Sequence, residues 1–323
     1  MKYGLPYKGS KNKLAERIVS LLPKRTHLID LFCGGCAVSH AALLRNKYEH
    51  IHINDINWMC PTLFIDALNG KYQNETRWIS REDFFRLKDT DPYVAVVWSF
   101  GNNLRDYLYS KEIEPLKKAI HYAIFFRDYS LGKDLGYDLS FIEPISDIQR
   151  RYAAVKRYFS QFGHVRQQSF EGAESSILQI TEAYSRKNQT GECGKMEHKS
   201  HLSKKNTNAQ ANFNQEKAAT ALHRLQYRER QLSMPRNSGG AISNITSSVL
   251  DYQQVTIPDD SVIYCDIPYE GTEGYLEIDS GGFDYERFYD WCEHQTQPVF
   301  ISSYQMPDDR FDCIEEFSHR STL

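Results

Sequence analysis

The segment LIDLFCGGCAVSHAAL, residues 28–43, determines the fold class that the sequence predicts. An apolar run leads into Gly34-Gly35, and a stretch with helical spacing of apolar residues follows the glycines. Strand, glycine turn and helix in this order are typical of a nucleotide-binding α/β unit, because the glycines let the backbone approach the ligand and the helix presents free N–H groups. We therefore interpret residues 28–43 as the start of a mostly parallel sheet with a cofactor loop.

The sequence around this segment extends it to a βαβ unit. Strands are expected at His27–Phe32 and His50–Asp55, with a helix over Ala37–Leu44 between them. Asp55 follows the glycines by about 20 residues, where an acid that binds ribose hydroxyls is expected. The loop does not match the full dinucleotide fingerprint, so NAD is not favoured as the ligand.

Other segments have the periodicity of core elements. Ser10 has the chemistry of a helix cap, and Pro23 that of a helix stop. The expected helices span residues Lys11–Leu22, Glu112–Asp128 and Ser146–Phe162, and the further expected strands span Tyr93–Trp98, Ser261–Asp266 and Pro298–Ser302.

The composition restricts the class of protein. The 323 residues are 41% hydrophobic and 25% charged, with a net charge of −3, so the chain as a whole carries no polyanion-binding signal. No apolar run approaches the roughly 18 residues that span a bilayer, and the N-terminus is too polar for a secretory signal. Seven scattered cysteines favour free thiols in a reducing compartment. We expect a cytoplasmic protein.

One segment differs from the rest in charge. Residues 185–215 are poor in apolar side chains and are expected to form a mobile basic loop. Residues 186–236 contain eleven Lys or Arg and four Glu, a net charge of +7, so the remainder of the chain carries −10. A basic segment on an acidic protein suggests contact with a polyanion, although a solvated loop would have the same composition.

The cysteines in Cys33-Gly34-Gly35-Cys36 permit two other interpretations. A redox dithiol has this spacing and also opens a helix, but the usual tuning residues are absent between the thiols. A zinc site would need further ligands, and only His40 is close in sequence, so we expect no metal.

A second motif gives the first a specific meaning. Asp266-Ile267-Pro268-Tyr269 ends the strand expected at 261–266, and with it the chain resembles the Dam-like, D12 class, α-type adenine-specific DNA N6-methyltransferases, whose catalytic motif is D-P-P-Y. The residues around Tyr7 and Lys11 resemble the family's first cofactor motif. Asp30 to Gly35 resembles its F-x-G-x-G loop, and Asn54 to Asn57 resembles its ribose-binding motif. The resemblance covers roughly residues 3–130 and 250–307.

The resemblance implies a fold, a cofactor and a set of site residues. The fold would be a Rossmann-like S-adenosylmethionine-dependent methyltransferase with an inserted, mainly helical recognition region. The cofactor would be S-adenosylmethionine, converted to S-adenosylhomocysteine with no metal, and the target an adenine flipped out of duplex DNA. The implied catalytic residues are Asp266, Ile267, Pro268 and Tyr269, and the implied cofactor-binding residues are Tyr7, Lys11, Asp30, Phe32, Gly34, Asp55 and Asp266.

Two positions depart from the family pattern. Cys36 replaces the second glycine of F-x-G-x-G, which would weaken cofactor binding if the position needs a positive φ. Ile267 replaces the first proline of D-P-P-Y. The implied role of residue 267 is to accept a hydrogen bond with its backbone carbonyl, which isoleucine also provides, and Pro268 still favours an extended residue 267.

The expected organisation follows from the same motifs. A discontinuous catalytic domain would comprise residues 1–130 and 250–323, and a target-recognition region residues 131–249. Basic helical segments are the candidates for contact with base edges and phosphates. The residues singled out are Arg150, Arg157, Arg224 and Arg228. Phe100 to Asn103 and Ser302 to Tyr304 are expected near the base.

Several alternatives remain open at this point. The chain could be a catalytically silent DNA-binding relative, could act on RNA or on cytosine N4, or could be a dithiol oxidoreductase. Asp at 266 favours adenine, since relatives that act on cytosine N4 tend to have serine there. The expected partner is duplex DNA, with no membrane, a monomeric state, and a restriction endonuclease as a candidate partner of a bacterial or phage enzyme.

Overall fold

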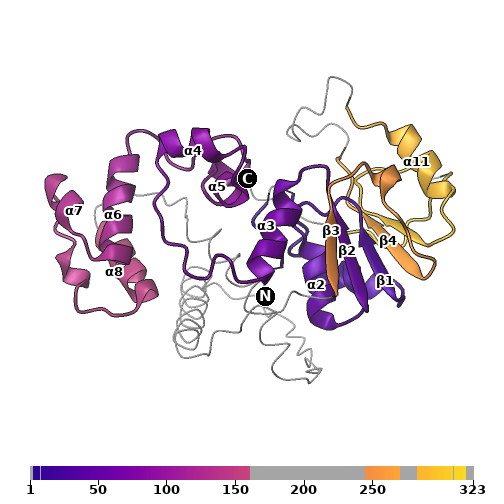
Figure 1. The fold of residues 1–323 in the computed structure, drawn as a ribbon, viewed down its shortest axis with the longest axis horizontal. Coiled ribbons are helices and arrows are strands. Elements are labelled where there is room, and N and C mark those ends of the chain that lie inside the picture. The colour runs from indigo at the N-terminus through magenta and orange to yellow at the C-terminus, as the bar shows by residue number, and fades with distance from the viewer. Residues whose placement is uncertain (1–2, 8, 161–243, 270–281, 308, 318–323) are drawn as a thin grey trace, which may run out of the picture. The chain divides into compact units, whose positions relative to one another are not determined.

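The computed structural model describes residues 3–7, 9–160, 244–269, 282–307 and 309–317 (Figure 1). By their internal contacts these residues divide into two compact units. Unit 1 holds the described residues up to Gln73 together with those from 244 onward, and unit 2 holds residues 74–160.

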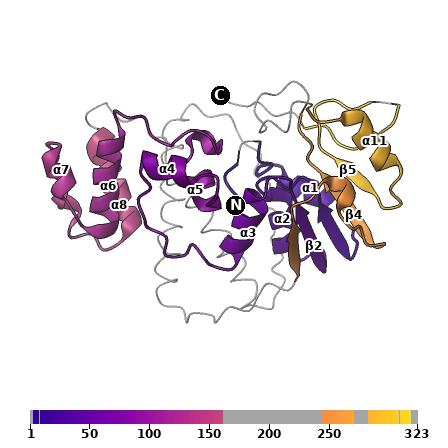
Figure 2. The ribbon, with the colours of Figure 1, turned by 45° about the horizontal axis from the view of Figure 1, so that its top comes forward.

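Five parallel strands form a single sheet in unit 1, in the order β3-β2-β1-β4-β5 (Figures 1 and 2). The strands are β1 (His27–Asp30), β2 (His50–Asn54), β3 (Ile245–Ser248), β4 (Ser261–Cys265) and β5 (Val299–Ile301). In the register of the sheet, Asp30 pairs with Ile53 on one side and with Tyr264 on the other. From β1 the sheet extends through β2 to β3 on one side, and through β4 to β5 on the other. The order of the strands therefore reverses between β1 and β4, and ligands bind at such a point in folds of this type.

Helices cover both faces of this sheet. The described residues of unit 1 form α1 (Ala15–Leu21), α2 (Ala37–Arg45), α3 (Met59–Leu68) and α11 (Tyr285–Glu293), with a 3-10 turn at Tyr252–Gln254. Ile29 and Ile263 pack with Phe288 of α11 in one apolar cluster. α2 contacts β1 and β2, and α1 packs on α2. Because neighbouring side chains of a strand point to opposite faces, β1 is buried on both sides, as a central parallel strand requires.

The sequence predicted most of unit 1. The four strands expected here and the helix after the glycines are confirmed within one or two residues. The first helix begins at Ala15 and not at Lys11, because residues 11–14 form hydrogen-bonded turns in which Lys11 O accepts from the N–H groups of Leu14 and Ala15. Ser10 is therefore not its cap. β3 was not predicted, because Ile-Thr-Ser-Ser is mostly polar, and it lies at the sheet edge beside β2.

Unit 2 is helical. It contains α4 (Arg81–Leu87), α5 (Pro92–Val97), α6 (Glu114–Phe126), α7 (Ser130–Asp134) and α8 (Ile148–Ser160), with 3-10 turns at Phe100–Asn102 and Ser140–Ile142. α7 and α8 both contact α6, and the three lie together in both views (Figures 1 and 2). Ile124 of α6 and Val155 of α8 belong to the apolar cluster that joins them. The helices expected at 112–128 and 146–162 are thereby confirmed.

The strand expected at Tyr93–Trp98 is wrong, since these residues form α5 and its C-terminal end. The carboxylate of Asp91 accepts hydrogen bonds from the N–H groups of Tyr93 and Val94, and Pro92 occupies the first helical position, where its missing N–H costs nothing. Every residue of α5 is buried. A fully buried helix of β-branched residues has the apolar run of a buried strand, and periodicity alone cannot separate the two.

Candidate active site

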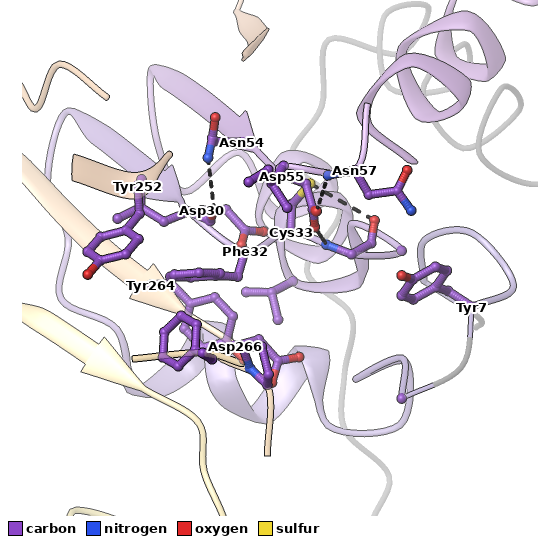
Figure 3. Close-up of a pocket in the computed structure, with 18 of the residues that line it drawn as sticks. Tyr7, Asp30, Phe32, Cys33, Asn54, Asp55, Asn57, Tyr252, Tyr264 and Asp266 are labelled. Atoms are coloured by element: carbon purple, nitrogen blue, oxygen red, sulfur yellow. Dashed lines mark hydrogen bonds between the residues drawn. The ribbon is translucent and has the colours of Figure 1, made fainter. Parts of the chain in front are cut away.

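Three aspartates stand at the carboxyl ends of three adjacent parallel strands. Asp30 ends β1, Asp55 follows β2, and Asp266 follows β4. Because the strands are parallel and neighbouring, these ends meet at one edge of the sheet. All three residues line a cavity of about 510 Å³ (Figure 3). The cavity therefore lies where the topology of the sheet reverses, and three carboxyl groups line it.

Asp30 is buried, with 1% of its surface exposed. The Ser39 hydroxyl donates to Oδ2 of Asp30 at 2.5 Å, whereas Oδ1 has no hydrogen-bond partner among the described residues. Burial, opposed by the Ser39 hydrogen bond and aided by the nearby carboxylates of Asp266 and Asp55, raises the pKa of Asp30 to about 7. A buried acceptor without a donor is rare in folded proteins and fits a ligand that brings an N–H or O–H group.

Asp55 is fixed by two backbone groups. The N–H of Gly34 donates to Oδ2 at 2.8 Å, and the N–H of Asn57 donates to Oδ1 at 2.9 Å. Burial raises the pKa of Asp55, while these two N–H groups act to lower it. Each carboxylate oxygen can accept a second bond, so Asp55 can still bind hydroxyl groups in the cavity.

The glycine loop is tightly packed and strained at one residue. Gly34 has φ 43°, and Cys36, at the start of α2, has φ 57° and ψ 30°. The left-handed conformation costs a residue other than glycine about 1–2 kcal/mol. Position 36 therefore does adopt the positive φ that favours glycine, and this chain forms the loop with cysteine there. The carbonyl of Gly35 accepts from Leu5 N–H at 2.6 Å, which ties the loop to the N-terminal segment.

Lys11 and Tyr269 hold the carboxylate of Asp266. The Lys11 ammonium donates to both oxygens, at 2.5 and 2.7 Å, and the Tyr269 hydroxyl donates to Oδ1 at 3.1 Å. Burial raises the pKa of Asp266, and the charge and hydrogen bond of Lys11 oppose that shift. The same ammonium lies 4.7 Å from the centre of the Tyr269 ring. The carboxylate of Asp266 is thus oriented by a cation and a phenol at the rim of the cavity.

The other residues of the D-I-P-Y motif have distinct environments. The side chain of Ile267 is 1% exposed and packs in the cluster of Phe288, so an aliphatic residue suits this position. The Pro268 carbonyl accepts a hydrogen bond from the Tyr285 hydroxyl at 3.0 Å. The ring of Tyr269 lies 4.2 Å from that of Tyr304, which is 78% exposed. Ile267 and Pro268 therefore anchor the motif in the protein, and the half-buried ring of Tyr269 packs against the exposed ring of Tyr304.

Aromatic side chains form another wall of the cavity. The Phe32 ring lies 5.6 Å from Tyr252 and 5.7 Å from Phe283, between centres. Phe32 and Tyr7 were predicted as site residues, and both line the cavity (Figure 3). Tyr252 and Phe283 were missed, because they follow no motif and reach the site only through packing against α11.

Asn54 joins the strand ends beneath the cavity. Its amide nitrogen donates to the carbonyls of Leu31 and Leu250, and its oxygen accepts from the Ser248 hydroxyl and from Leu250 N–H. One side chain therefore satisfies backbone groups beside β1 and after β3. It holds the loop that carries Asp55 in place. Asn54 belongs to the segment that resembles the ribose-binding motif, but its structural role was not predicted from the sequence.

The predicted DNA-contacting residues are in other parts of the chain. Arg150 and Arg157 are exposed on α8 of unit 2. Arg151 between them is buried and donates to the carbonyls of Ile145 and Ile124, so it holds α8 to its neighbours. Arg224 and Arg228, like the basic segment 186–236, lie outside the described residues. Phe100 lines a second cavity, of about 520 Å³, within unit 2.

A parallel sheet with helices on both faces and acids at its carboxyl edge is the arrangement of a Rossmann-like methyltransferase, and the fold class predicted from the sequence is confirmed. Residues 7–128 match the family model of D12 class N6 adenine-specific DNA methyltransferases. The resemblance inferred from the motifs is thereby confirmed over these residues. Methylation of adenine in DNA is the activity of this class.

Two further findings concern ligands and membranes. In the part of the chain that the structure describes, no group of three or more His, Cys, Asp or Glu side chains is placed to hold a metal ion. None of the described helices combines the length and the apolar character that crossing a membrane demands.

Proposed function

We propose that the protein is a site-specific DNA adenine N6-methyltransferase that transfers a methyl group from S-adenosylmethionine directly to N6 of a flipped-out adenine. The observation that carries this proposal is the position of Asp266. Its carboxylate follows β4 at the rim of the cavity, oriented by Lys11 and Tyr269, within a D-I-P-Y sequence. The family of residues 7–128 supports the substrate class.

The cavity fits the proposed cofactor in charge and in hydrogen-bonding groups. S-adenosylmethionine carries an ammonium and a sulfonium group, and the cavity presents the carboxylates of Asp30, Asp55 and Asp266. The partnerless Oδ1 of Asp30 suits a donor from the methionine part, and Asp55 retains acceptor capacity for ribose hydroxyls. Tyr7, Phe32 and Gly34 would complete the pocket. When bound, the cofactor supplies a methyl group on a sulfonium, which is a good leaving group.

The chain's task is to position the target amine. Adenine N6 is a weak nucleophile, since its lone pair is delocalised into the ring. In the proposal, the Asp266 carboxylate accepts one N6 hydrogen and the backbone carbonyl of Ile267 accepts the other, which favours a pyramidal nitrogen with its lone pair aimed at the methyl group. Orientation of this kind can reduce a barrier by several kcal/mol without a covalent intermediate.

Aromatic rings are proposed to hold the flipped base. Tyr269 would stack on adenine, a contact worth roughly 1–3 kcal/mol in nucleic-acid complexes. Tyr304 packs against Tyr269 and is largely exposed, so it can support that ring or contact the same base. Lys11 is a positioning residue in this account, because it acts through the carboxylate of Asp266.

Recognition of the DNA sequence is assigned to other regions. We propose residues 131–249 as the target-recognition region and residues 1–130 with 250–323 as the catalytic domain. Arg150 and Arg157 on α8, together with Arg224 and Arg228, remain the proposed DNA contacts. Their guanidinium groups suit phosphates and guanine edges.

The test is to incubate the protein with S-adenosylmethionine labelled in its methyl group and with unmethylated duplex DNA, then to identify the labelled nucleoside. Label in N6-methyl-2′-deoxyadenosine supports the proposal. Label in cytosine, or in RNA offered as a competitor, would show that the same site acts on a different substrate. Cofactor binding without transfer to any of them would identify a silent relative, and no cofactor binding at all would reject the proposal.

A further inference from the structure

The two cysteines of the glycine loop are not used by the proposed reaction, yet they lie together. The Sγ atoms of Cys33 and Cys36 are 3.5 Å apart. The N–H of Cys36 donates to the carbonyl of Cys33 at 2.6 Å, which closes a four-residue turn. Such a turn brings its end Cα atoms within about 7 Å, and disulfides span Cα separations of roughly 4.4–6.8 Å. The backbone therefore already has the spacing that a disulfide needs.

The two thiols differ in their access to the cavity. Cys33 lines the cavity and is 7% exposed, whereas Cys36 is fully buried behind it. The cavity also presents the carboxyl groups of Asp30 and Asp55, which attract a small cation, whereas the carboxylate of Asp266 is paired with Lys11. A cationic disulfide that enters the cavity can thus reach Cys33 first, with Cys36 in place as the resolving thiol.

We infer that Cys33 and Cys36 form a dithiol modification site, which a small disulfide converts to an intramolecular disulfide within the cofactor loop. The sulfur of Cys33, as thiolate, attacks one sulfur of the small disulfide and forms a mixed disulfide. The first small thiol leaves and takes up the proton that Cys33 released. The sulfur of Cys36, likewise deprotonated, then attacks that of Cys33 and expels the second small thiol, which takes up the second proton. Two protein thiols are oxidised and one disulfide is reduced to two thiols.

Closing the bond changes the loop, because the sulfurs must approach from 3.5 Å to about 2.05 Å. The residues between them have little freedom: Gly34 N–H is bonded to Asp55, and Gly35 O is bonded to Leu5. A Cβ added to Gly35 would lie 2.9 Å from the Leu5 carbonyl, which shows how closely the segments pack. In the inference, the strain of closing the bond falls on the short segment between the sulfurs and weakens the hydrogen bond from Gly34 to Asp55. The expected loss of cofactor affinity rests on the proposed function.

The experiment treats the full-length protein with cystamine, a cationic disulfide. Burial raises the pKa of both thiols, so the incubation is run at mildly alkaline pH. After alkylation and digestion with trypsin, Cys33 and Cys36 fall in one peptide, residues 26–45, which contains no other cysteine and no internal Lys or Arg. Mass spectrometry then reads the disulfide directly, as a peptide that is not alkylated and lacks two hydrogen atoms.

The expected result is a disulfide in peptide 26–45, formed more slowly when S-adenosylhomocysteine is present. We expect about a tenfold rise in the dissociation constant of S-adenosylmethionine, reversed by dithiothreitol. A peptide that remains fully alkylated, or carries only a mixed disulfide on Cys33, would overturn the inference. If the disulfide forms and the affinity for S-adenosylmethionine does not change, the inferred effect on cofactor binding is wrong. If the reduced protein binds no cofactor, the proposed function is rejected. The mass of peptide 26–45 still shows whether the disulfide forms.

Two variants distinguish the effect of oxidising the loop cysteines from the effect of oxidising other thiols. Cys33→Ser removes the accessible sulfur, so cystamine should leave the cofactor affinity of that variant at its untreated value. Cys313→Ser removes an exposed cysteine outside the cavity and should behave as the wild type does. The comparison of treated, untreated and re-reduced wild-type protein needs no variant and stands if Cys33→Ser does not fold.

Discussion

Lys11 and Asp266 are 255 residues apart in the chain, and the ammonium of Lys11 contacts both carboxylate oxygens of Asp266. The side chains of both residues are mostly buried, so the contact is shielded from solvent. It joins the turns before α1 to the end of β4. The two halves of the sequence that carry the family's motifs therefore meet at one ion pair.

Replacing Lys11 should change how activity depends on pH. Burial raises the pKa of Asp266 and Lys11 lowers it, so Lys11→Gln should raise that pKa further. Because the ionised carboxylate of Asp266 is a stronger acceptor for the N6 hydrogen than the protonated acid, activity should fall as pH falls through its pKa. The acid limb of kcat/KM should therefore move to higher pH by about one unit in the variant.

Lys13→Gln is the matched control, since Lys13 is exposed and lies two residues further along. Its pH profile should equal that of the wild type. An unchanged acid limb in Lys11→Gln would show that Lys11 does not act through Asp266.

Asp30 predicts a pH dependence of stability. Its pKa is about 7 in the folded protein, raised from an ordinary value of 3.8, so the folded state binds this proton more tightly than the unfolded chain does. The stability that results is fully present below the ordinary pKa and is lost as pH rises through about 7. Asp30→Asn cannot ionise, and it should therefore be more stable than the wild type at about pH 8 but not at about pH 4.

The measurement is urea unfolding of wild type and Asp30→Asn at both pH values. The difference in unfolding free energy should grow between them by on the order of 2–4 kcal/mol. Asp55 and Asp266 titrate in both proteins, so the comparison isolates Asp30 together with its repulsion of these two carboxylates. A difference that does not vary with pH would contradict the assignment.

Tyr269 should contribute through its ring more than through its hydroxyl. Tyr269→Ala removes the proposed stacking surface and should lower kcat/KM for DNA by about 10–100-fold. Tyr269→Phe keeps the ring and removes the 3.1 Å hydrogen bond to Asp266, so its loss should be much smaller. Equal losses in the two variants would reject stacking as the main role. Tyr304→Ala should have an intermediate effect, because the two rings are in contact.

The N-cap of α5 can be tested by stability alone. Asp91→Ala removes the acceptor for two helical N–H groups and should destabilise the protein by about 1–2 kcal/mol. Asp91→Asn keeps a capping oxygen and should recover most of that loss. Asp89→Ala, at an exposed site nearby, should stay within about 0.5 kcal/mol of the wild type. A neutral Asp91→Ala would contradict the capping role.

The sheet could be predicted from sequence where short apolar runs ended in polar residues. Ile29 and Ile263 lie in such runs, and their strands were correctly expected. The same signal failed for α5. All of its residues are buried, so its sequence lacks the alternation of apolar and polar residues that marks a surface helix. Asp91 and Pro92 together form a helix-start signal, which could have corrected that expectation. β3 could not be predicted, because a strand at the sheet edge can be mostly polar. It is held by its backbone pairing with β2, which leaves no apolar pattern in the sequence.

The site was predictable to the extent that it follows strand ends. Asp30, Asp55 and Asp266 each come at the end of an expected strand, and parallel pairing brings such ends together. The contact of Lys11 with Asp266 depends on the turns at residues 11–14, which the sequence did not indicate. Tyr252 and Phe283 enter through side-chain packing, for which one sequence carries no local signal.

The proposed activation of adenine N6 by Asp266 is tested by Asp266→Ala. Methyl transfer to duplex DNA and binding of S-adenosylmethionine should be measured on the same preparation, beside Asp266→Asn. Transfer should fall by on the order of 10²-fold or more in Asp266→Ala, and less in Asp266→Asn, whose amide oxygen remains an acceptor. Transfer to adenine N6 at the wild-type rate in Asp266→Ala would contradict the account.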